Sequence, residues 1–296
     1  MDWSRFEDGL SQTSILTIGI GVFAALCVAA ALGTAIRLKR EKQKGQSTRF
    51  DAQEGYIVSA VLGLLALLIG FTFSIAVDRF DTRRRLVLEE ANAIGTTYLR
   101  AQLLKEPYRA RMSDLLIRYT DNRIILARAK PGEGASLLAI NDALITDVWV
   151  TTIAAFDSIK EFDFSSTYLE SVNNVIELDA SRKVARRARI PFEVYVVLFA
   201  NLVMSAAVLG YVLRGPKGRL SAGFLILLFA LALVLIVDVD RPTLGGIVED
   251  QLPMVEMRKS IGTRLPAALD RLRAADYGPS PASGPVSRKW KRRASD

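Results

Sequence analysis

A long apolar run that passes directly into charged helical sequence constrains the fold of this chain more than any other feature. Residues 56–77 are 22 consecutive positions without a charge, and no proline or glycine separates them from the charged segment that begins at Asp78. A helix rises 1.5 Å per residue, so this run crosses a hydrocarbon core of about 30 Å. We therefore expect one continuous helix that leaves a membrane and enters a soluble domain.

Three more apolar runs indicate further membrane-spanning helices: residues 14–36, 194–213 and 220–237. A water-soluble helix repeats its apolar residues at a period of about 3.6 instead of filling whole segments with them. The first run is too long for a signal peptide, and Asp2, Glu7 and Asp8 precede it against a single Arg5. A signal peptide needs positive charge there. We expect four spanning helices and no cleaved leader.

The segment 78–189, between the second and third spans, is expected to be a helical soluble domain. Helices are predicted at 79–105, from Pro107 to 130, at 135–159, and from a cap at Ser165 and Ser166 to 189. An apolar stripe marks the first of them: Leu86, Ala93, Ile94, Ala101 and Leu104. The predicted class is an all-α integral membrane protein. Its predicted parts are 1–54 (first span and basic loop), 55–77 (second span), 78–189 (helical domain), 190–240 (third and fourth spans), 241–275 (helical tail) and 276–296 (disordered basic tail).

The residue inventory argues against catalysis. The chain has no histidine and one cysteine, Cys27, which excludes zinc sites, disulfides and histidine-dependent nucleophiles. Glycine patterns that bind nucleotides are absent as well. Acidic pairs occur at Glu89 with Glu90 and at Asp238 with Asp240, and we interpret them as solvated charge on helix surfaces. We predict neither enzyme activity nor a metal or cofactor.

Small residues recur along one side of the second predicted span, at Ser59, Gly63, Ala66, Gly70 and Ser74. Such a stripe is typical of close packing between membrane helices. It could instead form the wall of a pore, in which Leu67 and Phe71 would be a hydrophobic constriction. Both interpretations could hold on different arcs of the helix.

The same helix carries a family resemblance. Gly70-Phe71 is followed by Arg79-Phe80 at the spacing found in the second membrane helix of bestrophins. The wider run GFTFSIAVDRFDTRRRLVLEEANAIGTTYLRAQLL, with Glu89, Glu90 and Asn92, is similar to uncharacterised prokaryotic bestrophin-like proteins. A segment like the one from Asp238 through Asp240 and Pro242 follows the last span in those proteins. The resemblance covers roughly residues 14–260.

This resemblance implies a homo-oligomer, pentameric if it follows bestrophins, with the second span around a central anion pathway. The apolar neck of bestrophins falls on Gly63, Leu67 and Phe71. Bestrophins bind calcium after the fourth span, but two carboxylates beside Arg241 make a poor calcium site. We expect Asp240 instead to cap a helix start near Pro242. The alternative function is a non-conducting membrane sensor or scaffold that acts through the helical domain.

Basic residues guide the expected orientation and partners. The loop 37–54 holds six of them, which alone would place that loop in the cytoplasm. More basic residues flank the helical domain and end the chain, so we expect that domain and both termini to be cytoplasmic at the inner membrane. The row Arg83, Arg84 and Arg85 could attract anions or contact lipid headgroups. The net charge of +8 fits contacts with anionic lipid, and no nucleic-acid motif accompanies it.

Overall fold

Helices make up all the regular structure that is described. The computed structural model describes residues 13–44, 52–129, 132–242 and 245–276. The elements within these ranges are α2 (Ile15–Lys44), α3 (Ala52–Ala101), α4 (Tyr108–Ala127), α5 (Gly134–Phe156), α6 (Phe164–Arg187), α7 (Phe192–Val212), α8 (Gly215–Asp240), α9 (Leu252–Lys259) and α10 (Leu265–Asp276), with a π-helical turn, Ser260–Arg264, between the last two. The predicted all-α class is confirmed. The predicted disordered basic tail, 276–296, lies outside the described residues except for Asp276, which ends α10.

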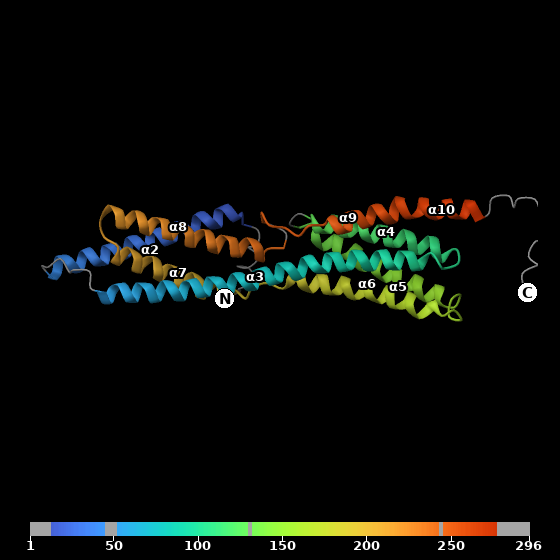
Figure 1. The fold of residues 1–296 in the computed structure, drawn as a ribbon, viewed down its shortest axis with the longest axis horizontal. Helices are drawn as coiled ribbons and strands as arrows, with labels where there is room; N and C mark the ends of the chain where they lie inside the picture. Colours follow the sequence, from blue (N-terminus) through green and yellow to red (C-terminus); the bar gives the residue numbers. More distant parts are fainter. Residues whose placement is uncertain (1–12, 45–51, 130–131, 243–244, 277–296) are drawn as a thin grey trace, which may run out of the picture.

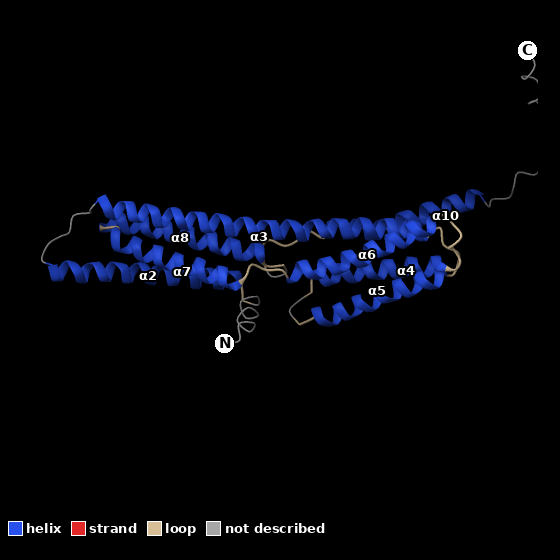
Figure 2. Cartoon of the chain, turned by 90° about the horizontal axis from the view of Figure 1, so that it is seen from below, coloured by secondary structure: helices blue, strands red, loops and turns tan. Residues whose placement is uncertain are grey.

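The molecule is elongated, and α3 runs through nearly all of it (Figure 1). Helices α2, α7 and α8 lie beside the first half of α3, while α4, α5, α6 and α9 gather around the second half (Figures 1 and 2). The uncharged run and the charged segment after it are therefore parts of one 50-residue helix. This long helix joins two separate hydrophobic cores.

Five helical segments, not four, are long and apolar enough to cross a membrane. The additional segment is α5, whose mean hydropathy of 1.4 is the lowest of the five. The sequence pattern placed α5 in a soluble domain, but Asp142 and Asp147 are the only charged residues among its 23. Its apolar residues also continue onto the outward face, where Val150 and Ile153 are exposed. A helix that is apolar on both faces satisfies the composition of a membrane span.

Close backbone contact holds α2 against α7. A Cβ added to Gly33 would lie 2.0 Å from the Ala207 carbonyl oxygen, and one added to Gly210 would lie 2.0 Å from that of Ala30. The Thr34 hydroxyl donates a hydrogen bond of 2.8 Å to the Gly210 carbonyl oxygen at the same crossing. Small residues thus provide tight helix packing here, at a pair of helices that the sequence did not single out.

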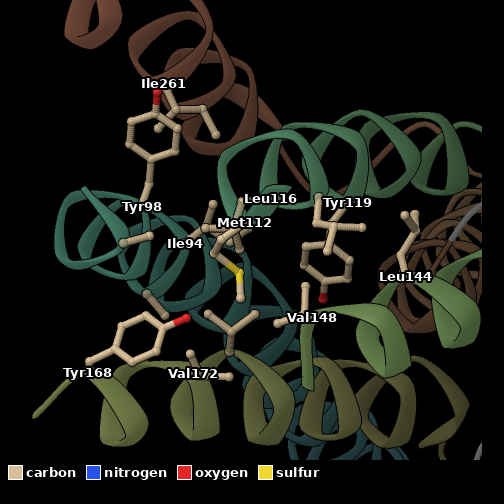
Figure 3. Packing of buried hydrophobic residues seen from close by; sticks show 14 of the residues in the cluster. Ile94, Tyr98, Met112, Leu116, Tyr119, Leu144, Val148, Tyr168, Val172 and Ile261 are labelled. Atoms are coloured by element: carbon tan, nitrogen blue, oxygen red, sulfur yellow. The ribbon is translucent and has the colours of Figure 1, made fainter. Parts of the chain in front are cut away.

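The second core lies among α3, α4, α5 and α6 (Figure 3). Ile94 from α3, Met112 and Leu116 from α4, Val148 from α5 and Val172 from α6 converge in it. The apolar stripe predicted along this part of α3 is buried throughout, as the 3.6-residue period requires: Leu86, Ala93, Ile94, Ala101 and Leu104.

The start of α6 differs from the prediction. The helix begins at Phe164, so Ser165 and Ser166 lie inside its first turn. Ser166 Oγ donates back to the Asp163 carbonyl oxygen at 3.4 Å, and no side chain caps the helix. The expected serine cap is therefore wrong, because the turn before α6 already continues into helical backbone at Asp163.

Candidate functional site: the exposed face of helix α3

Helix α3 buries one side and exposes the other. Leu65 and Ala76 are fully buried, and Thr72 is 4% exposed. The opposite side carries Leu67 and Phe71, which are 53% and 62% exposed. The five small residues singled out in the sequence lie on this exposed side too: Ser59, Gly63, Ala66, Gly70 and Ser74. All seven residues thus lie on a face that nothing else among the described residues covers.

The two glycines of this face are not packing positions within one chain. A Cβ added to Gly63 or Gly70 would meet no atom within 4 Å, in contrast to Gly33 and Gly210. The small-residue stripe therefore leaves open space beside α3. A neighbouring subunit or an aqueous path could fill that space, since no described part of the protomer packs against these two glycines.

The exposed face continues beyond the apolar half of α3. Asp81, Arg84, Leu88, Asn92 and Thr96 follow it along the helix, and all five are exposed. Two grooves flank this ridge. The α3/α6 groove has a volume of about 1020 Å³ and is lined by residues that include Glu89, Asn92, Arg100, Glu170 and Glu177. The α3/α9 groove has a volume of about 640 Å³ and is lined by residues that include Arg84, Arg85, Leu252 and Glu256.

Arg83 in the middle of α3 forms hydrogen bonds with the end of α8 and with the segment that follows α8. Its Nε donates to Glu249 Oε1 at 2.7 Å, and its Nη2 donates to the Val239 carbonyl oxygen at 2.9 Å. The guanidinium also lies 6.0 Å from the ring centre of Phe80, and both Phe80 and Arg79 of the family motif are half-buried. Arg83 is buried and so is not accessible to free anions or lipid headgroups, whereas Arg84 and Arg85 are exposed.

Glu90 is the centre of a buried ionic network, which corrects its interpretation as solvated surface charge. The residue is fully buried, whereas Glu89 beside it is exposed and pairs with Arg85 at 3.7 Å. Glu90 accepts hydrogen bonds from the Tyr119 hydroxyl, from Arg123 and from Arg182. A carboxylate without water requires such partners, and here they come from α4 and α6.

Asp179 extends this network to α5. Its Oδ1 accepts hydrogen bonds from Asn141 Nδ2 at 2.8 Å and from the Tyr119 hydroxyl at 3.2 Å. Burial raises the pKa of Tyr119 well above its ordinary value, and the neighbouring Glu90 raises it further. The phenol thus stays protonated and can donate to either carboxylate.

Lys183 closes the network at the surface. Its ammonium group contacts the carboxylates of Asp179 and Asp142. Burial alone would lower the pKa of Lys183, but the hydrogen bonds to Asp142 and Asp179 outweigh this effect and raise it. The hydrogen bond from Lys183 lowers the pKa of Asp142. The network therefore links α3, α4, α5 and α6 through charged groups.

The sequence contained one signal for this network. Glu90 lies four residues after Leu86 and four before Ile94, so it belongs to the buried side of α3. A charge within an apolar stripe indicates a buried, paired group. The partners Arg123 and Arg182 could not have been found in this way, because they come from other helices.

The two acidic residues in the last turn of α8 accept hydrogen bonds from the backbone of neighbouring segments. Asp240 is buried and accepts hydrogen bonds of 3.2 Å from the Ile190 amide and the Tyr195 hydroxyl. Asp240 is the last residue of α8 and supports the start of α7. It does not cap a helix near Pro242, which is half-buried and lies two residues after the end of α8. Asp238 accepts from the Gly246 amide at 2.9 Å. Within the part of the chain that the structure describes, no group of three His, Cys, Asp or Glu residues could hold a metal ion.

Comparison with known families agrees with this arrangement. The model of the bestrophin-like domain matches residues 24–248, which includes α3 and the segment after α8. The chain belongs to the bestrophin-like family. A search of curated proteins finds no match.

Solved structures of bacterial bestrophin homologues share the fold. A single-substitution variant of the homologue from Klebsiella pneumoniae superposes with a TM-score of 0.64 at 16% identity, over 86% of this chain and 97% of that one. The structure of the homologue from the same organism phased with zinc gives a TM-score of 0.61 at 16% identity, over 83% of this chain and 96% of that one. The bestrophin-like fold and the apolar helices together support a membrane protein, and the fold suggests an ion channel of the bestrophin type.

Proposed function

We propose that this bestrophin-like protein is a homo-oligomeric channel that conducts inorganic anions along the exposed face of α3. One observation carries the proposal: no described part of the protomer covers the small residues of α3 or its large apolar residues Leu67 and Phe71, although the opposite side of the same helix is buried. Several copies of α3 around an axis, five if the chain follows bestrophins, would turn these faces towards one another.

Leu67 and Phe71 supply the constriction in this proposal. They lie one helical turn apart, and Gly63 lies one turn before Leu67. Rings of large apolar side chains gate pores by expelling water. Glycine at the first position leaves a neck of two apolar rings, with a wider entrance at Gly63. Ser59, Ala66, Gly70 and Ser74 line the path or the subunit contact beside it.

Four helices cross the membrane in this proposal: α2, the first half of α3, α7 and α8. Helix α5 stays outside, in a helical soluble domain between the second and third spans. It packs against α4, which exposes Arg111, Asp114 and Arg118 along its length. Hydrocarbon around α5 would also surround these charges, and each would cost several kcal/mol or more there. The charged network of Glu90 and Asp179 is placed outside the membrane on the same ground.

The basic residues beside the membrane-spanning helices support an orientation of the protein in the membrane. Exposed arginines leave the apolar half of α3 at Arg84 and Arg85, and Arg187 and Arg189 approach α7. Basic flanks of this kind favour the cytoplasmic side, where they also contact anionic lipids of the inner membrane. We place the helical domain and both termini there. The alternative of a non-conducting sensor is not favoured, since the fold suggests a channel.

A matched pair of variants tests the proposal. Phe73 follows Phe71 by two residues and so lies about 200° around the helix from it. Purified protein is first sized by mass in mild detergent and then assayed for chloride flux in liposomes. Phe71→Ala should raise chloride flux several-fold by widening the neck, while Phe73→Ala should leave it unchanged. Equal effects of the two substitutions, or a monomer without flux, would contradict the proposal.

A further inference from the structure

The outer side of α5 carries an apolar surface that nothing in the described chain covers. Trp149, Val150, Ile153 and Phe156 recur along one side of the helix and are 39%, 53%, 57% and 37% exposed. Phe162, in the turn that follows, is 50% exposed. We call these five residues the outer α5 surface. A contiguous apolar patch on a helix in water usually marks a binding site.

The charge around this surface is opposite to that of the whole chain. From Glu133 to Asp163 there are six acidic residues and one basic residue, Lys160, although the chain carries a net charge of +8. Three exposed carboxylates follow the end of α5, beside Phe156 and Phe162: Asp157, Glu161 and Asp163. An occupant should therefore combine basic and apolar groups. An anionic membrane surface would be repelled.

A second copy in the proposed ring does not reach this surface. Helix α5 packs on α4 and α6 and lies on the far side of the domain from α3 (Figures 1 and 2). Subunits that meet along the exposed face of α3 therefore turn their α5 helices outward. The outer α5 surface needs a different occupant.

The chain itself contains a segment of the required chemistry. Residues 288–293 read Arg-Lys-Trp-Lys-Arg-Arg, with five positive charges around Trp290. Helix α10 ends at Asp276, at the end of the molecule where α5 also ends (Figures 1 and 2). Eleven residues, 277–287, connect α10 to the basic run, and they can extend to roughly 36 Å, more than three helix diameters of about 10 Å.

We propose that the basic run 288–293 docks on the outer α5 surface of the same protomer. Trp290 packs against the exposed aliphatic and aromatic side chains, while the arginines and lysines pair with Asp157, Glu161 and Asp163. Arginine can also lie over the faces of Trp149 and Phe156, where the ring quadrupole attracts a cation. Docking explains why a helix of the soluble domain has the composition of a membrane span.

Disulfide trapping in the full-length protein tests this docking. Cys27→Ser removes the natural thiol, and Ser287→Cys is combined with Ala154→Cys, next to the outer α5 surface. The control pairs Ser287→Cys with Asn92→Cys, on the exposed face of α3. Docking raises the local concentration of the tail thiol near residue 154. Under mild oxidation the disulfide between residues 287 and 154 should therefore form about tenfold faster than the one between 287 and 92. Peptide mass mapping identifies the linked residues, and gel filtration checks that each variant is folded.

Charge reversal provides the second readout. Lysine at 157, 161 and 163 should slow closure of the first pair to the control rate, and glutamate at 288, 289, 291, 292 and 293 in the same chain should restore it. Lysine at 170 and 177, in the α3/α6 groove, should change nothing. The same rates are measured with phosphatidylglycerol vesicles present. The proposal is overturned by equal rates of disulfide formation in the two cysteine pairs, by disulfides that join two chains, or by a fall of the first pair to the control rate when the vesicles are added. Equal rates would mean that the tail is not bound, and disulfides between chains would mean that the tail binds a second copy. A fall on addition of vesicles would mean that the tail binds the membrane surface instead.

Discussion

The guanidinium of Arg83 lies 2.7 Å from the carboxylate of Glu249, and only 2% and 7% of the two side chains are exposed. This ion pair joins the middle of α3 to the segment between α8 and α9, where the two cores of the molecule meet. The pair contributes to the position of the segment after α8 against α3, together with Met254 and Ile261, which are buried in the core that α3 shares with α4, α5 and α6.

Removing Glu249 should therefore destabilise the protein strongly. Glu249→Ala leaves the Arg83 charge buried without its partner, and the loss is expected at about 3–5 kcal/mol. Glu89→Ala on the same helix breaks the exposed pair with Arg85 and should cost no more than a few tenths of a kcal/mol. Thermal unfolding in detergent compares the two variants. A similar loss in both would show that Arg83 and Glu249 do not act as a buried pair.

The hydroxyl of Tyr119 should matter more than that of Tyr168, although both residues are fully buried. Tyr119 donates within the network of Glu90 and Asp179, while the Tyr168 hydroxyl has a single contact of 3.4 Å with Thr152 Oγ1. We expect Tyr119→Phe to lower the free energy of unfolding by about 1–3 kcal/mol, since it leaves buried carboxylates short of a donor. Tyr168→Phe should cost less than half as much in the same denaturation assay.

Glycine-to-alanine substitutions should lower the stability of the protomer where two of its helices touch, and should not lower it on the open face of α3. Gly210→Ala places a methyl group against the Ala30 backbone and should destabilise the monomer, because two helix backbones must move apart. The added methyl group of Gly70→Ala meets no described residue within 4 Å, so the stability of the isolated protomer should hold or rise slightly. Subunit number and chloride flux are then measured for Gly70→Ala. A change there without a change in protomer stability places Gly70 at a contact or path outside the protomer.

Acid should weaken the contact between α5 and α6. The hydrogen bond from Lys183 lowers the pKa of Asp142 in the folded state, so its stabilisation is present above the ordinary aspartate pKa and is lost as the pH falls through the folded value. The difference in melting temperature between the parent protein and Asp142→Asn should therefore shrink as the pH is lowered from 7 towards 3. In a Lys183→Met background the same difference should be small at every pH. A difference that grows on acidification would contradict the assignment.

The sequence predicted the long helix, the buried stripe and the small-residue face because each follows from the local period of one helix. It could not distinguish a small-residue stripe that packs from one that stays open, since Gly33 and Gly70 differ only in what another helix places beside them. The partners of Glu90 and Arg83 were missed for the same reason. Hydropathy alone likewise does not decide whether α5 lies in a membrane, because α5 carries apolar residues on two faces.

If the open face of α3 lines the conducting path, chemical modification of single thiols along that face should alter chloride flux. Cysteine is introduced singly at Ser59, Gly70 and Ser74, and as a control at Phe73, in a Cys27→Ser background. A negatively charged methanethiosulfonate reagent is then applied to liposomes during chloride flux. Chloride flux should fall about tenfold at the three face positions and stay unchanged at Phe73, because a fixed negative charge repels anions in the path. If the cysteines at all three positions are modified and the chloride flux is undiminished, the open face of α3 does not line the path.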